Sequence, residues 1–312
     1  MDEHGLIWRT LALDSGVSEA KMNRAIRQQW ILPVGRGVYV RAKDLPEDPG
    51  ERKRELFRRR SLAAAIGLER NAPDGGRTLS HQSAASLLGL QLLLPDLGTI
   101  HITNGRSAGG KLIEGRMVHA GLLNEDDVTV VGGVRVTSLA RTAVDVALSL
   151  SDFAQILTVF DSALRAGVAR EELERRLMGP RHGVAAARHA LAYANGLSDN
   201  PGESWSRAQI IECGLPVPIL QSKYELRDGA IVFCDYDWEG KAVGEFDGFK
   251  KYRRTLLKPG TDPEDAVTAE KIREDKLRDL GLGVIRWWWE HLVTRTLEAH
   301  LRQNLPRWGV VL

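Results

Sequence analysis

Four acidic residues near the end of the chain have the types and the spacing to bind a metal ion. Asp235 and Asp237 lie two residues apart in an apolar segment, and Glu245 and Asp247 are spaced alike in the next. Residues two apart on a strand share a face, so antiparallel pairing should bring one acid pair beside the other. Oxygen ligands without histidine or cysteine favour Mg²⁺ or Mn²⁺. Such an ion can activate water and hold a scissile phosphate, so the spacing predicts a phosphodiesterase-type site.

A helix, a three-stranded meander, a second helix and a last strand should position these acids. The turn-forming stretch 197–202 precedes a helix over 203–212 that carries Glu203. Strands are expected at 224–226, 231–238 and 242–247, a charged helix at 265–280 and an aromatic strand at 284–289. On that strand Trp288 should point opposite to Trp287 and Trp289. The alternative is that both acid pairs end edge strands and point into solvent.

Residues 1–45 are expected to form a small unit of their own. Ser18 can cap a helix over 19–29 that follows a tight turn, and two short strands around Gly35-Arg36-Gly37 come next. This order resembles a winged helix-turn-helix domain. The residues suited to contact phosphates or base edges are Lys21, Asn23, Arg24, Arg27, Gln28 and Arg36. The alternative is that they form an ordinary solvated helix face.

Residues 46–196 predict a mixed scaffold of helices and strands without a catalytic motif. A proline-rich linker at 45–50 leads into an arginine-rich helix, which we interpret mainly as a solvated face. Strands are expected at 99–103, 128–131 and 134–136, with helices at 140–148, 151–166, 170–178 and 183–194. His81, His101 and His119 have no metal-binding spacing, so structural roles are favoured for them.

The composition excludes several classes of protein. Lys and Arg number 43 against 41 Asp and Glu, so a nucleic-acid-binding surface must be local. No apolar run approaches the roughly 20 residues of a membrane span, and the start of the chain lacks the pattern of a signal peptide. We therefore expect a cytoplasmic protein with no membrane partner. Cys213 and Cys234 are the two cysteines, which argues against a disulfide scaffold or a structural zinc site.

Residues 197–312 resemble the PD-(D/E)XK nuclease core, in the branch similar to very-short-patch repair endonucleases. The resemblance rests on the segments Asp235-Tyr236-Asp237-Trp238, Gly244-Glu245-Phe246-Asp247-Gly248, Lys251-Tyr252, 270–278 and 281–287. It implies Asp235 and Glu245 as ligands of Mg²⁺ (or Mn²⁺) and Glu203 as an additional catalytic acid. Asp247 stands where the family has a lysine. Either Asp247 is a further ligand, or Lys250, Lys251 or Lys271 substitutes, or the site is degenerate.

Residues 1–195 resemble the abortive-infection type IV antitoxin family, which joins a winged-helix DNA binder to a larger mixed domain and whose members regulate transcription. The resemblance rests on the segments 35–39, 79–85 and 136–145. It implies duplex DNA as a partner, a cognate toxin in a toxin–antitoxin or phage-defence setting, and a homodimer.

The expected fold class is therefore α+β or α/β, in three parts. They are a winged helix at 1–45, a mixed scaffold at 46–196 and an endonuclease-like αβββαβ core at 197–312. The predicted function is a DNA-binding protein with a metal-dependent endonuclease domain. The alternatives are a non-catalytic transcriptional regulator or antitoxin with a degenerate nuclease fold, and a toxin restrained by its N-terminal part.

Overall fold

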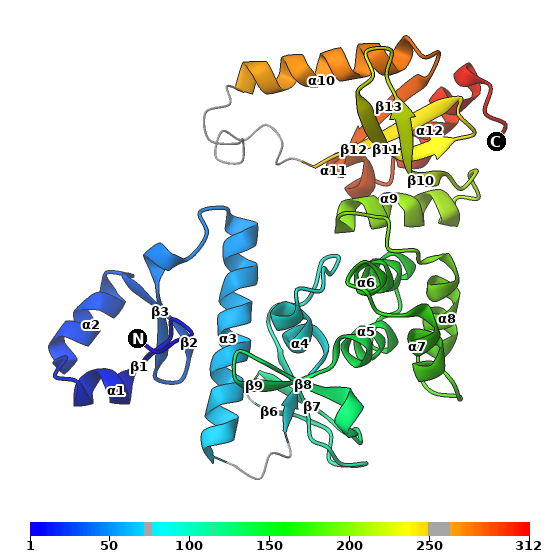
Figure 1. Ribbon diagram of the computed structural model, residues 1–312. Coiled ribbons are helices and arrows are strands. Elements are labelled where there is room, and N and C mark those ends of the chain that lie inside the picture. The colour runs from blue at the N-terminus through cyan, green and yellow to red at the C-terminus, as the bar shows by residue number, and fades with distance from the viewer. Residues whose placement is uncertain (72–76, 114, 249–262) are drawn as a thin grey trace. The chain divides into compact units, whose positions relative to one another are not determined.

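The computed structural model describes residues 1–71, 77–113, 115–248 and 263–312 (Figure 1). Two compact units make up the chain. The first contains residues 1–150 and 168–184, and the second contains residues 151–167 and 185–312. Both units combine helices with sheets, so the fold class is α+β, as predicted. Among the described residues, no helix has both the length and the apolar character needed to cross a membrane.

The first unit begins with two short helices beside a small sheet. Its strands have the order β1-β3-β2, and the elements are β1 (Ile7–Trp8), α1 (Arg9–Asp14), α2 (Glu19–Arg27), β2 (Ile31–Gly35) and β3 (Val38–Arg41). The Ser18 hydroxyl accepts a hydrogen bond from the Lys21 amide at 3.3 Å, which confirms the predicted cap of α2. Gly37, at φ 71°, allows the tight turn between β2 and β3.

A long helix and a six-stranded sheet form the rest of this unit. The strand order is β6-β7-β5-β4-β9-β8. The elements are η1 (Ala42–Asp44), α3 (Pro49–Asn71), β4 (Thr78–Leu79), α4 (His81–Leu88), β5 (Ile100–Thr103), β6 (Lys111–Ile113), β7 (Arg116–His119), η2 (Glu125–Asp127), β8 (Val128–Val131), β9 (Val134–Thr137), α5 (Leu139–Leu148) and α7 (Arg170–Arg176). Two of the α3 arginines bind within the unit: Arg59 pairs with Glu55 at 2.5 Å, and Arg60 donates to the Leu97 carbonyl at 3.2 Å.

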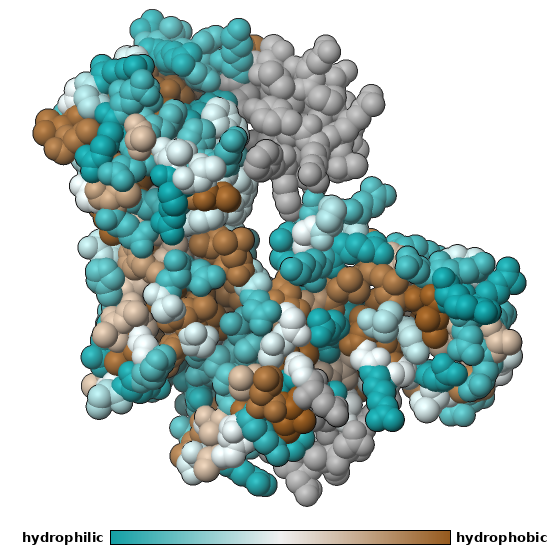
Figure 2. Space-filling view, turned by 180° about the vertical axis from the view of Figure 1, so that it is seen from behind, coloured by the Kyte–Doolittle hydropathy of each residue, from teal (hydrophilic) through white to brown (hydrophobic). Residues whose placement is uncertain are grey.

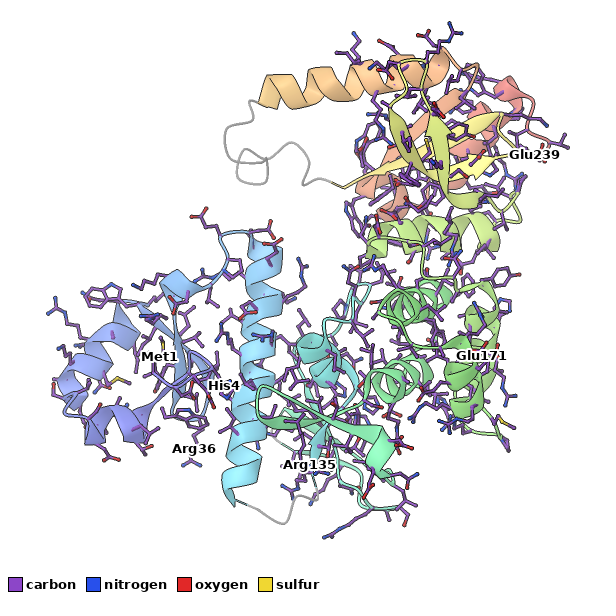
Figure 3. All side chains as sticks on the ribbon, in the orientation of Figure 1. Met1, His4, Arg36, Arg135, Glu171 and Glu239 are labelled. Carbon is purple, nitrogen blue, oxygen red and sulfur yellow. The ribbon has the colours of Figure 1, made fainter. Side chains whose placement is uncertain are left out.

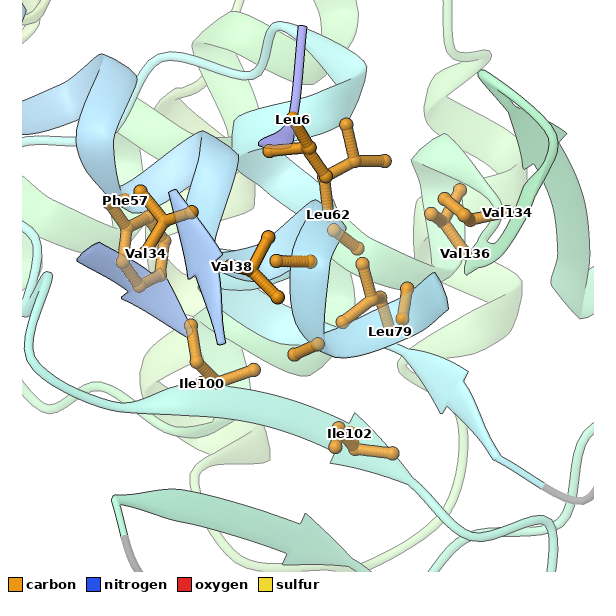
Figure 4. Packing of buried hydrophobic residues seen from close by; sticks show 14 of the residues in the cluster. Leu6, Val34, Val38, Phe57, Leu62, Leu79, Ile100, Ile102, Val134 and Val136 are labelled. Atoms are coloured by element: carbon orange, nitrogen blue, oxygen red, sulfur yellow. The ribbon is translucent and has the colours of Figure 1, made fainter. Parts of the chain in front are cut away.

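One hydrophobic core joins the small sheet to the larger one. Leu6, Val34 and Val38 from the first 45 residues pack in the same cluster as Leu79 and other residues of the six-stranded sheet (Figure 4). The structure therefore does not divide the chain at residue 45, where the sequence suggested a boundary. The expected winged-helix segment and most of the expected scaffold form one unit, because their apolar side chains pack against one another in a single core.

The second unit is built on a four-stranded sheet of order β10-β11-β12-β13. Strands β10, β11 and β12 pair antiparallel, and β13 pairs parallel to β12. The elements are α6 (Phe153–Arg165), α8 (Val184–Tyr193), α9 (Pro201–Glu212), β10 (Ile219–Glu225), β11 (Ile231–Trp238), β12 (Ala242–Asp247), α10 (Pro263–Arg278), β13 (Gly283–Trp288), α11 (Trp289–Val293), α12 (Leu297–Asn304) and η3 (Leu305–Trp308).

A buried ion pair explains why α6 belongs to this unit rather than to the expected scaffold. One guanidinium nitrogen of Arg207 on α9 lies 2.7 and 2.9 Å from the two carboxylate oxygens of Asp161 on α6. The Ser204 hydroxyl donates to the same carboxylate at 2.8 Å. Both charged side chains are almost fully buried, at 2% and 1% exposure. A charged pair at this depth must stay together, since either partner alone would be an uncompensated buried charge.

The triple tryptophan is partly at variance with the expected strand alternation. Trp287 is fully buried and Trp288 is 41% exposed, so these two do face opposite sides. However, β13 ends at Trp288, and Trp289 begins α11. Trp289 packs 5.5 Å from Phe246 and 5.8 Å from Trp205, measured between ring centroids, so its place is fixed by the turn into the helix.

Candidate functional site

Two of the predicted acids, Asp235 and Glu245, lie where β11 and β12 stop pairing. Counted from the turn, the last paired residues of the two strands are Tyr236 and Gly244. Asp235 and Glu245 are the next residues on β11 and β12, just beyond that pair. At this point the Phe246 amide donates to a carboxylate oxygen of Asp235 at 3.0 Å. Asp235 therefore reaches the backbone of β12 with its side chain, one residue beyond Glu245.

An irregularity in β10 lies opposite Asp235. Gln221, which lies across from Asp235, has φ 51°, and its side-chain amide donates to Asp235 at 3.3 Å. On either side of Asp235 the alternation is broken: Cys234 packs with Leu277 of α10, whereas the Tyr236 hydroxyl donates to the Glu203 carbonyl on α9 at 2.8 Å. Strict alternation does not hold at this irregularity, so the spacing of Asp235 and Asp237 alone does not give them a shared face.

Asp237 has a structural contact instead. The Tyr224 hydroxyl donates to one of its oxygens at 2.8 Å, and the Gly240 amide donates to the other at 2.8 Å. It thereby holds the turn between β11 and β12. Its carboxylate is engaged by the turn that brings the two strands together.

Glu245 is buried and paired with an arginine. Arg273 on α10 places its two terminal nitrogens 2.9 and 3.3 Å from the two carboxylate oxygens of Glu245, which is 3% exposed. The same arginine donates to the Phe233 carbonyl on β11 at 2.6 Å. Arg273 therefore links the two strands just where their backbone pairing ends. The cation beside Glu245 is therefore an arginine, whereas the sequence suggested a lysine at Lys250, Lys251 or Lys271.

Asp247, in the position where the resembled family has lysine, is also buried beside an arginine. Its carboxylate lies 3.7 Å from the Arg286 guanidinium on β13, and Arg286 also pairs with Glu274 of α10 at 3.3 Å. The buried side chain is 1% exposed. Arginines from the neighbouring helix and strand thus compensate the charges of Glu245 and Asp247.

Glu203 lies in the first turn of α9, and its pKa is shifted strongly upward. Burial, and secondly the charge of Asp235, raise its pKa from 4.5 to about 8, although the Asp199 amide donates to its carboxylate at 2.6 Å. The Asn200 side chain, which caps the helix, donates to it at 2.5 Å. Because Asp235 is an important cause of the shift, the two acids are electrostatic neighbours.

The predicted lysines do not take part in these described contacts. Lys271 is exposed on α10, two residues before Arg273, and Lys250 and Lys251 lie outside the described residues. The carboxylates of Glu203, Asp235 and Glu245 do not come close enough to form a ready-made metal site, in which one ligand atom from each residue lies within 4.8 Å of the others.

Within the described ranges, His81, His101 and His119 do meet this criterion. Their spacing in the sequence carries no metal-site signal, because His81 begins α4 whereas His101 and His119 lie on the separate strands β5 and β7.

The residues predicted to contact DNA are all exposed in the first unit. Lys21, Asn23, Arg24 and Arg27 are exposed on α2, and Gln28 is exposed directly after it, while Met22 is buried against the unit. Arg36 is exposed at the turn between β2 and β3 (Figure 3). Hydrophilic side chains predominate at the right-hand edge of Figure 2, where α1 and α2 lie. The burial pattern of α2 leaves its cationic face open to a ligand.

Comparisons with known proteins give relatives without a described activity. No protein-family model matches the chain. It is 30% identical over 159 residues to the uncharacterized proteins MT2308 and Rv2248 of Mycobacterium tuberculosis, strains CDC 1551 and H37Rv. The match covers 50% of this chain and 55% of each relative, so the chain spans about half the length of the curated relatives it matches. The crystal structure of the RV2827C protein from Mycobacterium tuberculosis is 18% identical, with a TM-score of 0.36 over 70% of this chain and 83% of that one.

Proposed function

We propose that this chain is a DNA-binding protein whose second unit is a metal-dependent phosphodiesterase of the PD-(D/E)XK type. The observation that carries the proposal is the contact of Asp235 with the Phe246 amide at 3.0 Å, which holds Asp235 beside the strand of Glu245. The order helix α9, three antiparallel strands, helix α10 and parallel strand β13 supports the same proposal.

The donor groups at this position suit a hard divalent cation. Asp235, Glu245 and Glu203 offer carboxylate oxygens alone, which are the ligands that Mg²⁺ and Mn²⁺ prefer. The raised pKa of Glu203 indicates a carboxyl group whose negative charge is poorly compensated in the described contacts. A bound cation would compensate that charge, and it would also polarise a phosphate and acidify a water molecule.

The chain's own residues have separate roles in this proposal. Asp235 and Glu245 bind the cation. Glu203, whose pKa of about 8 keeps much of it protonated at neutral pH, can hold or deliver a proton beside Asp235. Arg273 contacts Glu245 and supplies the positive charge that Asp247 cannot, so it would bind the phosphate once Glu245 turns to the cation.

The first unit binds duplex DNA in this proposal, through α2 and the turn that carries Arg36. The elements β1, α1, α2, β2 and β3 follow one another in an order that supports a winged helix. Lysine and arginine on α2 provide phosphate contacts, and Asn23 and Gln28 provide donors and acceptors for base edges. Binding of this kind depends steeply on salt.

A second candidate function is favoured by the same arginine. The pair between Arg273 and Glu245 satisfies the carboxylate without a metal ion, and Asp247 is compensated by Arg286. A chain in which these pairs are permanent would be a transcriptional regulator or antitoxin, with a degenerate nuclease fold used for binding a toxin or a second copy. Calorimetric titration with Mn²⁺ separates the two candidates, since the regulator would take up no ion at the acids.

Cleavage assays test the proposed function. The purified chain is incubated with supercoiled, linear and single-stranded DNA in Mg²⁺, Mn²⁺ or EDTA. We expect cleavage with metal only, and its loss in the double variant Asp235→Ala and Glu245→Ala, which should still bind DNA. Asp228→Asn is the control, because Asp228 lies in the turn between β10 and β11 of the same unit and makes an exposed pair with Lys276 at 2.6 Å. Cleavage that survives the double substitution would contradict the assignment.

A further inference from the structure

Three histidines converge from two neighbouring strands of the six-stranded sheet and from the helix that follows a third. His81 follows β4 and begins α4, His101 lies in β5 and His119 ends β7. The register pairs His101 with Met117 and Thr103 with His119, so His101 and His119 share a face of the parallel pair. The Ser80 amide donates to the His101 carbonyl at 3.1 Å, which brings His81 alongside. All three belong to the first unit.

The three rings are close enough to share one ion. The ring centroids of His81 and His119 are 3.6 Å apart, and those of His101 and His119 are 5.2 Å apart. Nδ1 of His101 lies 2.9 Å from Nε2 of His119, and one nitrogen from each ring lies within 4.8 Å of the others. Tetrahedral binding at about 2.0–2.1 Å places ligand nitrogens about 3.3 Å apart, so small ring rotations complete the geometry.

The surroundings keep these imidazoles in the form that binds metals. Burial lowers the pKa of all three rings, so they are neutral at physiological pH. Arg141 would oppose a nearby cation, but it is paired with Asp145 at 2.9 Å and with Asp127 at 3.1 Å. The charge of the arginine is therefore already compensated.

Two further features set the cluster apart from ordinary packed histidines. Nε2 of His101 is buried without a hydrogen-bond partner, which is costly for a polar atom. His81 has a left-handed backbone at φ 50°, which a residue with a side chain rarely adopts. Its Nδ1 lies 3.0 Å from the Ser80 hydroxyl, so that contact fixes the ring and leaves Nε2 to bind an ion.

We propose that His81, His101 and His119 bind one transition-metal ion of the Zn²⁺ class. Imidazole nitrogen is the ligand that such borderline ions prefer, whereas the acids of the second unit suit Mg²⁺. Three protein ligands leave a fourth position for water or another small ligand. The ion would tie together α4, β5 and β7, whose ligands lie far apart in the sequence. This site is independent of the proposed nuclease function.

Zinc content and cobalt spectra test the site in the full chain. The chain is stripped with chelator, loaded with Zn²⁺ alone and dialysed, and a Co²⁺-loaded sample is examined for visible absorption. We expect one Zn²⁺ per chain and the d–d bands of Co²⁺ in a site of low coordination number. The double variant Asp235→Ala and Glu245→Ala should retain both signals, because it removes only the carboxylate site.

Single substitutions assign the ligands. His81→Ala, His101→Ala and His119→Ala should each weaken Zn²⁺ binding by more than the roughly 10- to 100-fold that loss of an outer partner costs. His182→Ala, which changes an exposed histidine of the same unit, should bind like the wild type. Circular dichroism verifies folding, and half-buried His119 is the substitution the fold should tolerate best. A folded wild type that retains no Zn²⁺, or a folded His119→Ala chain with wild-type affinity, would overturn the proposal.

Discussion

Arg273 and Glu245 form a two-point ion pair, with nitrogen–oxygen distances of 2.9 and 3.3 Å, at the place where β11 and β12 separate. The same guanidinium also donates to the Phe233 carbonyl at 2.6 Å. One arginine thus bridges both strands and compensates a buried carboxylate. In the proposed nuclease, this pair must loosen when Glu245 binds a cation, which makes Arg273 the residue whose replacement reports on the site most sensitively.

Replacing Arg273 should destabilise the metal-free chain and increase its response to metal. In Arg273→Met, Glu245 stays buried but loses the hydrogen bonds from Arg273, and we expect a loss of about 1–3 kcal/mol in the free energy of unfolding. Mn²⁺ should then raise the melting temperature more than it does in the wild type. Urea titrations and thermal melts measure both effects. Arg278→Met is the control on the same helix, since Arg278 is half exposed. An unchanged free energy of unfolding in Arg273→Met would show that the pair of Arg273 and Glu245 does not stabilise the fold.

The ionisation of Glu203 should make the chain less stable as the pH rises. Its pKa is about 8 in the folded chain against 4.5 ordinarily, so between these values the folded chain holds a proton that the unfolded chain has released. Stability is therefore fully kept below pH 4.5 and falls as the pH rises toward 8. In Glu203→Gln this part of the fall should vanish. Melting temperatures from about pH 5 to pH 8 measure it. Glu239→Gln, which changes an exposed glutamate, serves as control. If melting temperature falls equally steeply with pH in the wild type and in Glu203→Gln, the pKa of Glu203 is not raised.

The buried pair of Asp161 and Arg207 should be indispensable to the second unit. Asp161→Ala leaves Arg207 buried and uncompensated, and removes the acceptor of the Ser204 hydroxyl as well. We expect a loss of about 3–5 kcal/mol in the free energy of unfolding. Glu298→Ala breaks an exposed pair with Arg302 and should leave the urea midpoint near that of the wild type. Equal midpoints for the two variants would mean that the ion pair does not hold α6 to α9.

Arg27 should contribute a phosphate contact to DNA binding. In Arg27→Ala the affinity for duplex DNA should fall for all sequences, and the slope of log affinity against log salt should decrease by about 1. Fluorescence anisotropy over a series of salt concentrations gives both quantities. Arg175→Ala removes an exposed arginine from α7 of the same unit and should keep the wild-type slope. If the two variants bind DNA alike, α2 is not the contact surface.

Local patterns predicted the elements well, because each depends on residues close together in the sequence. Ser18 caps α2 as expected, and the strands over 231–238 and 242–247 have the predicted bounds. The hairpin turn and the strand alternation are short-range properties. The same holds for the exposure of Lys21 and Arg27, which follows from the helical position of buried Met22.

The contacts that define the sites could not be predicted in this way. Arg273 and Glu245 are 28 residues apart in the sequence. Which residue of α10 contacts Glu245, Arg273 or Lys271, depends on how the helix is rotated about its axis. The irregularity at Gln221, with φ 51°, lies opposite Asp235, and nothing in the local sequence marks it. The three histidines have no motif spacing, since sheet order brings them together. The extent of the second unit also depends on a long-range contact, because the ion pair of Asp161 with Arg207 holds α6 against α9.

Nicking of supercoiled plasmid by the wild type and by Asp235→Asn, in Mn²⁺ and in EDTA, tests the central claim most directly. Asparagine keeps the size of the side chain but removes the charge that would bind the cation. The account predicts nicking by the wild type in Mn²⁺, none in EDTA, and a rate for Asp235→Asn lower by at least about 100-fold, with DNA binding retained. Equal rates for the two proteins, or DNA binding without any nicking in Mn²⁺, would contradict it.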